Sequence, residues 1–338
     1  MLTVKTAVVI PNWDGKSRLG ACLDSIQAQS DPADVVVVDN GSRDGSAEFI
    51  RSKYPKVILL QNQRNLGFAG GVNIGLRYAL ENNYTYAALL NNDAIADRNW
   101  LKYLVEFLDK DKSGGIVVSK MLAADGKHID SAGEAYSIWG LPFATGRGKL
   151  DRGQYDKSGW VFGASGGASL YRLSMLKKIG LFDEDFFAYY EDVDISFRAQ
   201  LAGWKVGFEP KAKVVHQIGA TSKQIKGFTT YQTVKNLPWL MWKNIPRPTL
   251  WKIMPRLYLA YISFIFRALS KGQIWPVLKG VLMTKLLLPK KLLERRSIQK
   301  SRKVSLAYID SIITHDLPSN AVNLRRLRSA WWRLRGKK

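Results

Sequence analysis

Short apolar runs alternate with amphipathic segments along the first part of the chain. The apolar runs are bounded by turn residues and predict strands buried on both faces of a sheet; they span 6–11, 35–39, 57–61 and 87–91. Between them, apolar residues recur at three-to-four spacing over 17–29, 44–54 and 71–82, which predicts helices. This alternation predicts an α/β fold whose mostly parallel sheet carries helices on both faces.

Polar residues stand where three of these predicted strands end. They are Pro11-Asn12, Asp39-Asn40 and Asn91-Asn92-Asp93. Each pattern alone is most simply a turn, because Asn and Asp hydrogen-bond to their own backbone. Ligands of parallel sheets bind at the carboxyl ends of the strands, so we expect all three segments to line one crevice.

Several acidic residues can carry chemistry. Asp93 offers a hard oxygen ligand for Mg²⁺ or Mn²⁺ beside a diphosphate. Glu191, Asp192 and Asp194 open a predicted helix, where the helix dipole alone favours carboxylates. An aromatic run, Phe186 to Tyr190, precedes them. Desolvation there would raise the proton affinity of Asp192, which suits a general base for a hydroxyl group.

Three further features are less specific. His216 ends a strand-like run, where an isolated histidine is more often structural than a metal ligand, although neutral imidazole is a common ligand. The small residues from Gly163 to Ser169 permit close approach of the backbone to a ligand or to a helix. The single cysteine, Cys22, excludes an intrachain disulfide framework and a multi-cysteine zinc site.

Charge divides the chain of 338 residues into two parts. Residues 1–220 carry 26 Lys and Arg against 25 Asp and Glu, whereas residues 221–338 carry 25 against 3. The second part therefore supplies nearly all of the net charge of +23. A neutral body joined to a strongly basic segment predicts a partner that is anionic, either phospholipid headgroups or nucleic acid.

Beyond residue 220, Trp- and Leu-rich stretches broken by prolines predict several short amphipathic helices. The longest apolar stretch, Leu257 to Phe266, stops at Arg267 and is shorter than the roughly 20 residues of a spanning helix. We therefore expect residues 235–338 to lie on an anionic membrane surface, with Trp239, Trp242 and Trp275 among the headgroups.

Two expectations about location and partners follow. The N-terminal apolar run is too short for a secretory signal, which predicts a cytoplasmic protein, peripheral on the inner face of the membrane. The tail from Arg325 to Lys338 has the composition of an RNA-contacting arm. No RNP-like, zinc or helix-turn-helix pattern accompanies that tail, so nucleic acid is not expected as a partner.

Taken in order, these segments resemble the family 2 glycosyltransferases, which have the GT-A fold, and especially the bacterial rhamnosyltransferase-like branch. The motifs are Val9 to Gly15, Val36 to Ser46, Asn65 to Gly75, Leu89 to Ala94, Gly180 to Asp194 and Val214 to Ser222. The resemblance covers about residues 4–222. It implies a GT-A domain over 1–222, followed by a basic helical membrane-associating region over 223–338.

The resemblance also implies roles for individual residues. Those for the nucleotide are Pro11, Asn12, Asp39, Asn65 and Asn92; for the metal, Asp93, Asn91 and His216; for the acceptor, Glu191, Trp160, Gly166 and Gly167. Asp192 matches the general base of the family. One departure concerns the metal triplet, which has aspartate at both outer positions in the family but Asn91 at the first position here.

The activity implied by the resemblance is an inverting transfer of a sugar from a nucleoside diphosphate to a saccharide acceptor, with Mg²⁺ or Mn²⁺. Rhamnose from dTDP-rhamnose, a lipid-linked acceptor and a role in cell-surface polysaccharide synthesis are favoured. The alternatives are a UDP-hexose-dependent transferase of the same fold, a basic RNA-binding protein, and a scaffold that has lost turnover. The retained Asp93, Asp192 and His216 disfavour the scaffold.

Overall fold

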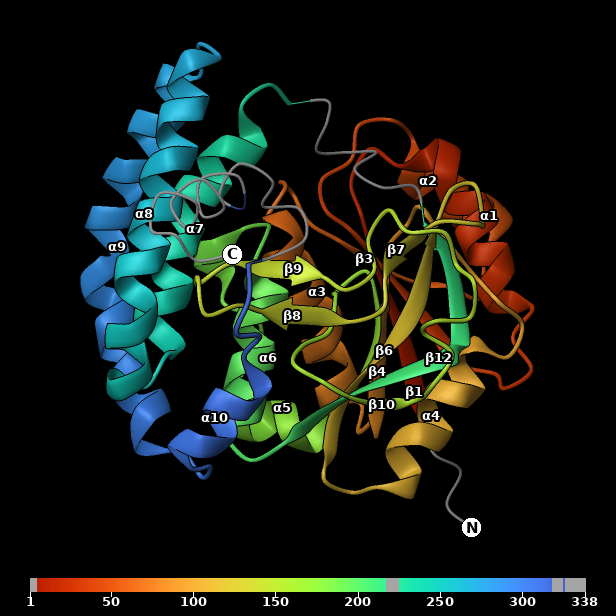
Figure 1. Ribbon diagram of the computed structural model, residues 1–338. Coiled ribbons are helices and arrows are strands. Elements are labelled where there is room, and N and C mark those ends of the chain that lie inside the picture. The colour runs from red at the N-terminus through yellow and green to blue at the C-terminus, as the bar shows by residue number, and fades with distance from the viewer. Residues whose placement is uncertain (1–4, 217–224, 318–324, 326–338) are drawn as a thin grey trace.

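The computed structural model describes residues 5–216, 225–317 and 325 (Figure 1). Its strands are β1 (Thr6–Asn12), β2 (Asp34–Asp39), β3 (Ile58–Gln61), β4 (Tyr86–Leu90), β5 (Ala94–Ala96), β6 (Gly114–Ala123), β7 (Ile129–Ser131), β8 (Glu134–Tyr136), β9 (Pro142–Ala144), β10 (Gly159–Val161), β11 (Ala168–Arg172) and β12 (Lys205–His216). Its helices are α1 (Lys16–Gln27), α2 (Ser46–Lys53), α3 (Gly67–Glu81), α4 (Trp100–Lys110), α5 (Leu173–Ile179), α6 (Glu191–Leu201), α7 (Phe228–Asn244), α8 (Arg247–Ser270), α9 (Ile274–Lys300) and α10 (Leu306–Ile312), with a 3₁₀ turn η1 (Glu184–Phe186).

Within the described ranges, ten strands form one sheet. Eight of them run in the order β10-β12-β6-β11-β4-β1-β2-β3, while β5 pairs with β12 and β7 with β6. The parallel pairings of β1 with β2 and β4, and of β6 with β12, confirm the predicted mostly parallel sheet. The antiparallel strand β11, between β4 and β6, was not predicted. The prediction that every strand is buried on both faces is wrong for β3, which ends the sheet and is half-buried.

Two apolar layers enclose the sheet. One face packs against α3, α5 and α6, and the opposite face packs against α1, α2 and α4. Strand β1 contributes to both layers, because Val9 points to the first and Val8 to the second. Alternation along strands that are buried on both sides explains why the sequence shows continuous apolar runs there.

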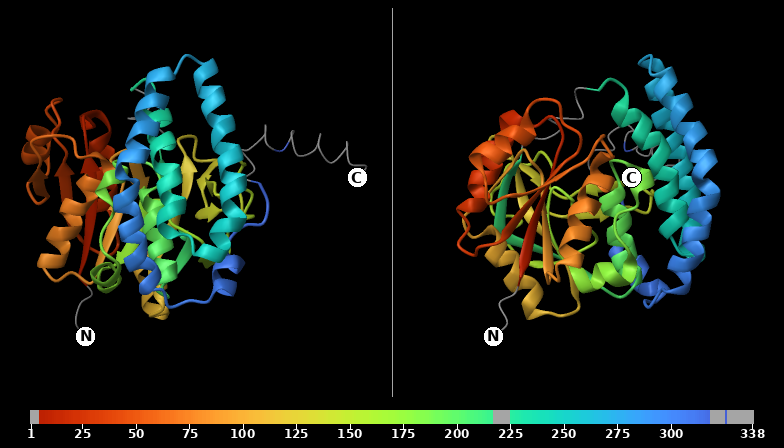
Figure 2. Two further views of the ribbon diagram at one scale, coloured as in Figure 1. Left: turned by 90° about the vertical axis from the view of Figure 1, so that its left-hand side faces the viewer. Right: turned by 180° about the vertical axis from the view of Figure 1, so that it is seen from behind.

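The C-terminal helices form a third layer that packs on the outer side of α6. Their shared core joins Phe186, Phe197 and Phe162 to Trp239 of α7 and to apolar residues of α8, α9 and α10. Figure 2 shows α7, α8 and α9 side by side along one side of the molecule. The expected boundary at residues 222 and 223 and part of the Val214–Ser222 motif lie outside the described residues, as does the tail beyond Arg325.

The predicted short helices are wrong in length. Helices α8 and α9 run for 24 and 27 residues, and Pro255 and Pro289 lie inside them without ending them. The expectation that α7 lies on a membrane surface also needs correction, since Trp239 is fully buried and Lys235 and Lys243 are buried. None of the helices in the described ranges combines the length and apolar content needed to span a bilayer.

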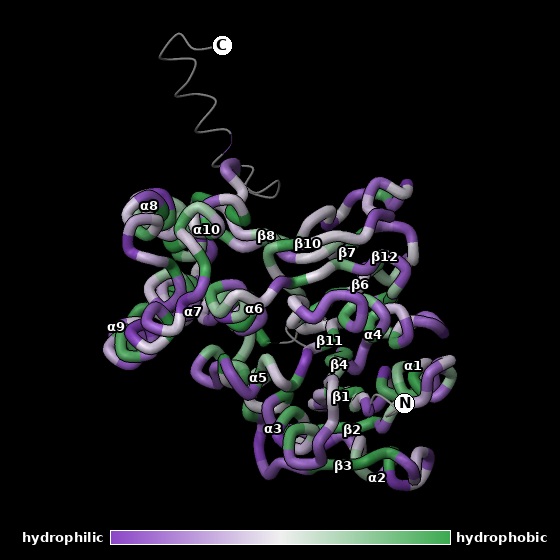
Figure 3. Tube along the Cα trace, turned by 90° about the horizontal axis from the view of Figure 1, so that it is seen from below, coloured by the Kyte–Doolittle hydropathy of each residue, from purple (hydrophilic) through white to green (hydrophobic). Residues whose placement is uncertain are grey.

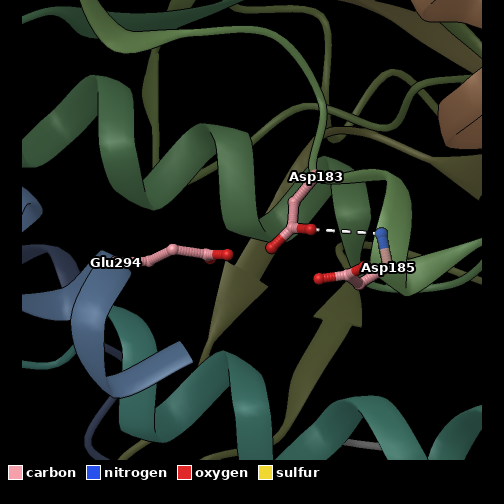
Figure 4. Close-up of side chains that lie close together, drawn as sticks. All are labelled: Asp183, Asp185 and Glu294. Atoms are coloured by element: carbon pink, nitrogen blue, oxygen red, sulfur yellow. Dashed lines mark hydrogen bonds between the residues drawn. The ribbon is translucent and has the colours of Figure 1, made fainter. Parts of the chain in front are cut away.

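A buried network of charges fixes the C-terminal helices to the segment before α6. Lys291 Nζ lies 2.6 Å from both Asp183 Oδ2 and Asp185 Oδ2, and Lys243 Nζ lies 2.6 Å from Asp183 Oδ2. Figure 4 shows Asp183, Asp185 and Glu294 directed toward one another. Three such carboxylates can hold a metal ion. The ammonium group of Lys291 already contacts all three, so this network is a structural one.

Two adjacent lysines test this network. Lys291→Met should lower the free energy of unfolding by about 1.5–3 kcal/mol, because it removes the fully buried ammonium group that contacts all three carboxylates and leaves them only Lys243 and Lys290. Lys290→Met is the matched control: Lys290 also contacts Asp185 at 2.6 Å, but its side chain is 56% exposed against 0% for Lys291. The control should cost about 1 kcal/mol or less. Urea denaturation followed by circular dichroism measures both, and equal losses would contradict the assignment.

Candidate active site

The register of the parallel strands brings polar side chains to one edge of the sheet. Asn12 at the end of β1 stands opposite Asp39 at the end of β2, and Asn12 Nδ2 donates to Asp39 Oδ1 at 3.2 Å. Strand β4 ends at Leu90, directly before Asn91. Asn92 Nδ2 then donates to Asn12 Oδ1 at 2.7 Å. These contacts join the ends of β1, β2 and β4 through buried amide groups.

His216 meets the Asn91–Asp93 turn from the far side of the sheet. It is the last residue of β12 and pairs with Ala94 of β5. Its Nε2 lies 3.2 Å from Asp93 Oδ1 and 3.1 Å from Asn91 Nδ2, while its Nδ1 lies 2.8 Å from Asp130 Oδ2. Burial lowers the pKa of His216, but its hydrogen bonds to Asp130 and Asp93 outweigh burial and raise that pKa to about 9.

The donor atoms around His216 Nε2 fit a divalent cation. The imidazole nitrogen lies 3.2 Å from the Asp93 carboxylate and 3.1 Å from the amide group of Asn91, which can present its oxygen instead. Asp130 orients the imidazole through Nδ1, as carboxylates commonly do behind metal-bound histidines. A cation here would take the place of the proton that this nitrogen otherwise holds.

Asp192 reaches the same region through the loop of small residues. It lies in the first turn of α6, and its Oδ2 accepts a hydrogen bond from the Gly166 amide at 3.2 Å. The next residue, Gly167, accepts a bond from the Asn91 amide at 2.9 Å through its carbonyl. A chain of short contacts thus links Asp192 to the Asn91–Asp93 turn. A Cβ on Gly166 would lie 2.9 Å from the Phe68 ring and one on Gly167 3.0 Å from the Met121 methyl group, so both positions are tightly packed.

The two carboxylates that open α6, Glu191 and Asp192, bind protons more tightly than exposed carboxylates do. Burial raises the pKa of Asp192, and hydrogen bonds from the Gly166 and Val193 amides only partly offset that effect. Burial and the charge of Asp192 raise the pKa of Glu191 further. Glu191 Oε2 is buried and has no hydrogen-bond partner among the described residues. The pair therefore favours one bound proton over two charges.

A strained loop presents this pair of carboxylates. Phe187, Tyr189 and Tyr190 have φ values of 63°, 68° and 72°, a region that side chains other than glycine rarely adopt. Helix α7 holds the loop, since Asn236 Nδ2 donates to the carbonyls of Phe186, Ala188 and Tyr189 at 2.9–3.0 Å. On the other side, the Ala69 amide donates to the Phe187 carbonyl at 3.2 Å.

Sequence reasoning missed three residues of the site. Asp130 of β7 contacts His216, and Arg147 Nη2 lies 3.1 Å from Asp130 Oδ1. Glu134 of β8 is held opposite Gly163 by two backbone hydrogen bonds. Burial and the charge of Asp192 raise the pKa of Glu134 to about 8. The segment 129–147 shows no clear periodicity, so no signal in the sequence pointed to these residues.

One of the residues expected near the nucleotide, Asn65, has other contacts. Asn65 Oδ1 accepts from the Gly67 amide at 2.8 Å and from Asn40 Nδ2 at 3.1 Å, so this oxygen organises the turn into α3. Asn40 Oδ1 accepts from Asn62 Nδ2 and the Leu66 amide in the same turn. Pro11 is half-buried in β1, next to Asn12.

Trp160 is not brought to this site. It lies on β10 opposite Gly207, against the Phe107 ring and the Lys205 ammonium group. On the neighbouring strand β6, Val117 pairs with Gly207 and Ala123 pairs with His216. The stretch from Val117 to Ala123 spans roughly 20 Å, which separates Trp160 from His216 along the sheet. Trp160 instead borders a separate hollow that Gln200 and Tyr308 also line. The prediction that Trp160 helps to bind the acceptor beside Glu191 therefore conflicts with its position.

Comparison with known proteins shows the family of the chain. The model of the family described as glycosyl transferase family 2 matches residues 7–180. N-acetylglucosaminyl-diphospho-decaprenol L-rhamnosyltransferase of Mycobacterium tuberculosis is 29% identical over 208 residues, which cover 55% of this chain and 66% of that protein. Poly-beta-1,6-N-acetyl-D-glucosamine synthase of Staphylococcus aureus is 26% identical over 53% of this chain and 41% of that protein. The chain thus spans less than two thirds of the length of these relatives.

Solved structures show the fold. S. aureus TarS 1–349 in complex with UDP superposes with a TM-score of 0.53 at 16% identity, covering 88% of this chain and 90% of that one. The mannosyltransferase PcManGT of Pyrobaculum calidifontis, in complex with GDP-Man and Mn²⁺, gives 0.53 at 16% identity, with 88% and 85% coverage. GalNAc-T7 with UDP, GalNAc and Mn²⁺ gives 0.56 at 17% identity, with 91% and 57% coverage. These likenesses confirm the expected GT-A fold.

Two glycines test the support of the strained loop. Gly67 and Gly148 both have positive φ, 75° and 77°, so alanine at either position costs about 1–2 kcal/mol of backbone strain. A Cβ on Gly67 would also lie 2.4 Å from the Phe187 carbonyl oxygen, whereas nothing lies within 4 Å at Gly148. Gly67→Ala should therefore destabilise the protein by about 1–3 kcal/mol more than Gly148→Ala in urea denaturation. Equal losses would show that the loop yields freely.

Proposed function

Because the chain belongs to glycosyl transferase family 2, we propose that it transfers a sugar from a nucleoside diphosphate to a hydroxyl group of a saccharide acceptor. One observation carries this proposal: Asp39, Asp93, His216 and Asp192, far apart in the sequence, are joined by short contacts at one edge of the sheet. The links are Asn12 and Asn92 on one side and Asn91, Gly167 and Gly166 on the other. In parallel sheets this edge is where ligands bind.

Roles for the residues follow from their chemistry. Asp39 offers a carboxylate acceptor for the nucleoside at the end of β2, and Asn12 at the end of β1 positions it. Asp93 and His216, with Asn91, would hold a divalent cation, which supplies positive charge to the departing diphosphate. Glu191 lies beside Asp192, and Gly166 donates a hydrogen bond to Asp192. These two residues would help to bind the acceptor.

The transfer is a single displacement at the anomeric carbon. The acceptor oxygen forms its bond to that carbon as the bond to the diphosphate oxygen breaks, which inverts the configuration. Asp192 takes the proton of the acceptor hydroxyl group, and its raised pKa makes it a stronger base than an exposed aspartate. The nucleoside diphosphate leaves with the electron pair of the broken bond.

The donor and acceptor are proposed from the relatives. The mycobacterial relative is named as an L-rhamnosyltransferase that acts on a diphospho-decaprenol-linked sugar. We propose rhamnose from dTDP-rhamnose as the donor and a polyprenyl-diphosphate-linked saccharide as the acceptor, within polysaccharide synthesis. The excess of cations in residues 221–338 supports a position on an anionic membrane, on the cytoplasmic face where nucleotide sugars are made available.

Asp192→Asn tests the general base. The amide cannot accept the proton, so the rate of transfer should fall by about 10²–10⁴-fold while donor binding, measured by calorimetry, stays unchanged. In the unaltered protein the rate should decline at low pH through the raised pKa of Asp192, because only the carboxylate is active. Asp31→Asn, at an exposed turn, is the control and should keep full activity. Full activity of the Asp192 variant would remove this residue from the role of base.

A panel of nucleotide sugars, with and without a chelator, tests the donor and the cation. Release of dTDP from dTDP-rhamnose in the presence of acceptor, lost with chelator and restored by Mg²⁺ or Mn²⁺, is the expected result. Turnover of UDP-hexoses alone would establish the alternative donor. Turnover that chelation leaves unchanged would contradict a cation held by Asp93 and His216.

A further inference from the structure

The outer side of the α8–α9 hairpin carries large apolar side chains that are about half exposed or more. On α9 they recur at three and four residues, at Trp275, Leu278, Leu282 and Leu286. On α8 the matching positions are Leu259, Ile262 and Phe266. Each helix is therefore apolar on two sides, because other residues of both helices pack in the third apolar layer. In Figure 3, α8 and α9 lie at the outer edge of the molecule, where apolar and polar segments alternate.

The end of the hairpin concentrates this exposure. We call residues 262–279 the hairpin tip. Its exposed apolar side chains are Ile262, Phe266, Leu269, Ile274, Trp275 and Leu278, and its cations are Arg267, Lys271 and Lys279. Trp275 is 81% exposed and Phe266 is 68% exposed, more than any other large apolar side chain in the described residues. All three cations are exposed, and no acidic residue occurs between Tyr261 and Lys291.

We infer that the hairpin tip docks onto an anionic phospholipid bilayer. Its apolar side chains enter the boundary between headgroups and acyl chains, and its cations contact the lipid phosphates. Apolar side chains bordered by Lys and Arg on a helix surface match the composition of such a layer. The charge complementarity favours lipid over a second copy of the chain, because two such tips would repel each other.

The position of the hairpin tip relative to the candidate active site determines which side of the protein faces the bilayer. In Figure 1 the tip extends beyond the rest of the molecule at the upper left, at the end where β12 leads toward α7, and Figure 2 shows the same projection. A Cβ on Gly227 would lie 2.4 Å from Pro276, and Thr230 hydrogen-bonds to Gln273, so the start of α7 touches the tip.

The start of α7 also touches the loop before Asp192. The Phe228 ring lies 6.1 Å from the Phe187 ring and 6.0 Å from the Tyr189 ring, and Thr229 Oγ1 lies 3.4 Å from the Tyr189 hydroxyl. One turn of helix therefore stands between the tip and the strained loop. Docking the tip brings the acceptor side of the site close to the bilayer surface. This orientation rests on the proposed lipid-linked acceptor, whereas the docking itself does not.

Flotation of the full chain with phosphatidylglycerol-containing vesicles, compared with pure phosphatidylcholine vesicles, tests the inference. The double variant Phe266→Ser/Trp275→Ser should lower the partition coefficient at least about tenfold, since two large apolar side chains no longer enter the bilayer. The matched control is Trp251→Ser/Leu293→Ser, at the other end of the same helices, where the side chains are 60% and 62% exposed. The control should lose less than about threefold.

A second variant separates charge from apolar contact. Lys271→Gln/Lys279→Gln should weaken binding to the anionic vesicles by up to about fivefold for each lysine and leave the weak binding to neutral vesicles unchanged. Equal losses in the tip and control variants would overturn the orientation. Equal binding to vesicles with and without phosphatidylglycerol would overturn the lipid assignment. A dimer in sedimentation that dissociates in the tip variant would overturn it as well.

These outcomes are distinguishable from those of the proposed function, because flotation needs neither donor nor acceptor. A chain that floats with anionic vesicles but releases no nucleoside diphosphate fails only as a transferase. A chain that transfers sugar to a water-soluble acceptor but does not float contradicts only the docking. Unchanged circular dichroism of the tip variant excludes unfolding as the cause of lost binding.

Discussion

The candidate active site depends on keeping several carboxylates close together in buried or partly buried positions. Burial raises the pKa values of Asp192, Glu191 and Glu134, and the charge of Asp192 raises those of Glu191 and Glu134 further. Arg147 pairs with Asp130 and His216 pairs with Asp93, so these two side chains neutralise only part of the negative charge of the site. Such a site gains free energy by accepting positive charge. Holding a cation at Asp93 and receiving a proton at Asp192 are two ways of doing so.

Carboxylates that repel one another stay in place only if the surrounding structure resists their separation. Much of that resistance comes from the basic C-terminal region. Asn236 of α7 holds the strained loop through three carbonyls, and Lys243 and Lys291 neutralise Asp183, which lies just before the loop. Several cations of the C-terminal region therefore form ion pairs inside the protein. Part of the excess positive charge in the sequence thus stabilises the fold.

The local patterns in the sequence predicted what is local in the structure. Strands β1, β2 and β4 follow their apolar runs, and α6 begins at Glu191 as expected. Asp130, Glu134 and Arg147 could not be predicted, because β7, β8 and the turn after β9 reach His216 and Asp192 only through tertiary contacts. Prolines misled the prediction in α8 and α9, since packing against α7 stabilises helices that local propensity would end. Trp239 and Trp275 look alike in the sequence, yet tertiary packing buries one and exposes the other.

Helix α7 connects the hairpin tip to the strained loop of the candidate active site. Its first turn contacts both the hairpin tip, at Gln273 and Pro276, and the loop residues Phe187 and Tyr189. Its middle contributes Asn236 to the same loop. The proposed docking surface and the strained loop before the proposed base, Asp192, thus pack against the same helix. For an enzyme whose acceptor is anchored in lipid, that arrangement limits the search of the acceptor for Asp192 to two dimensions, because protein and acceptor are oriented by the same surface.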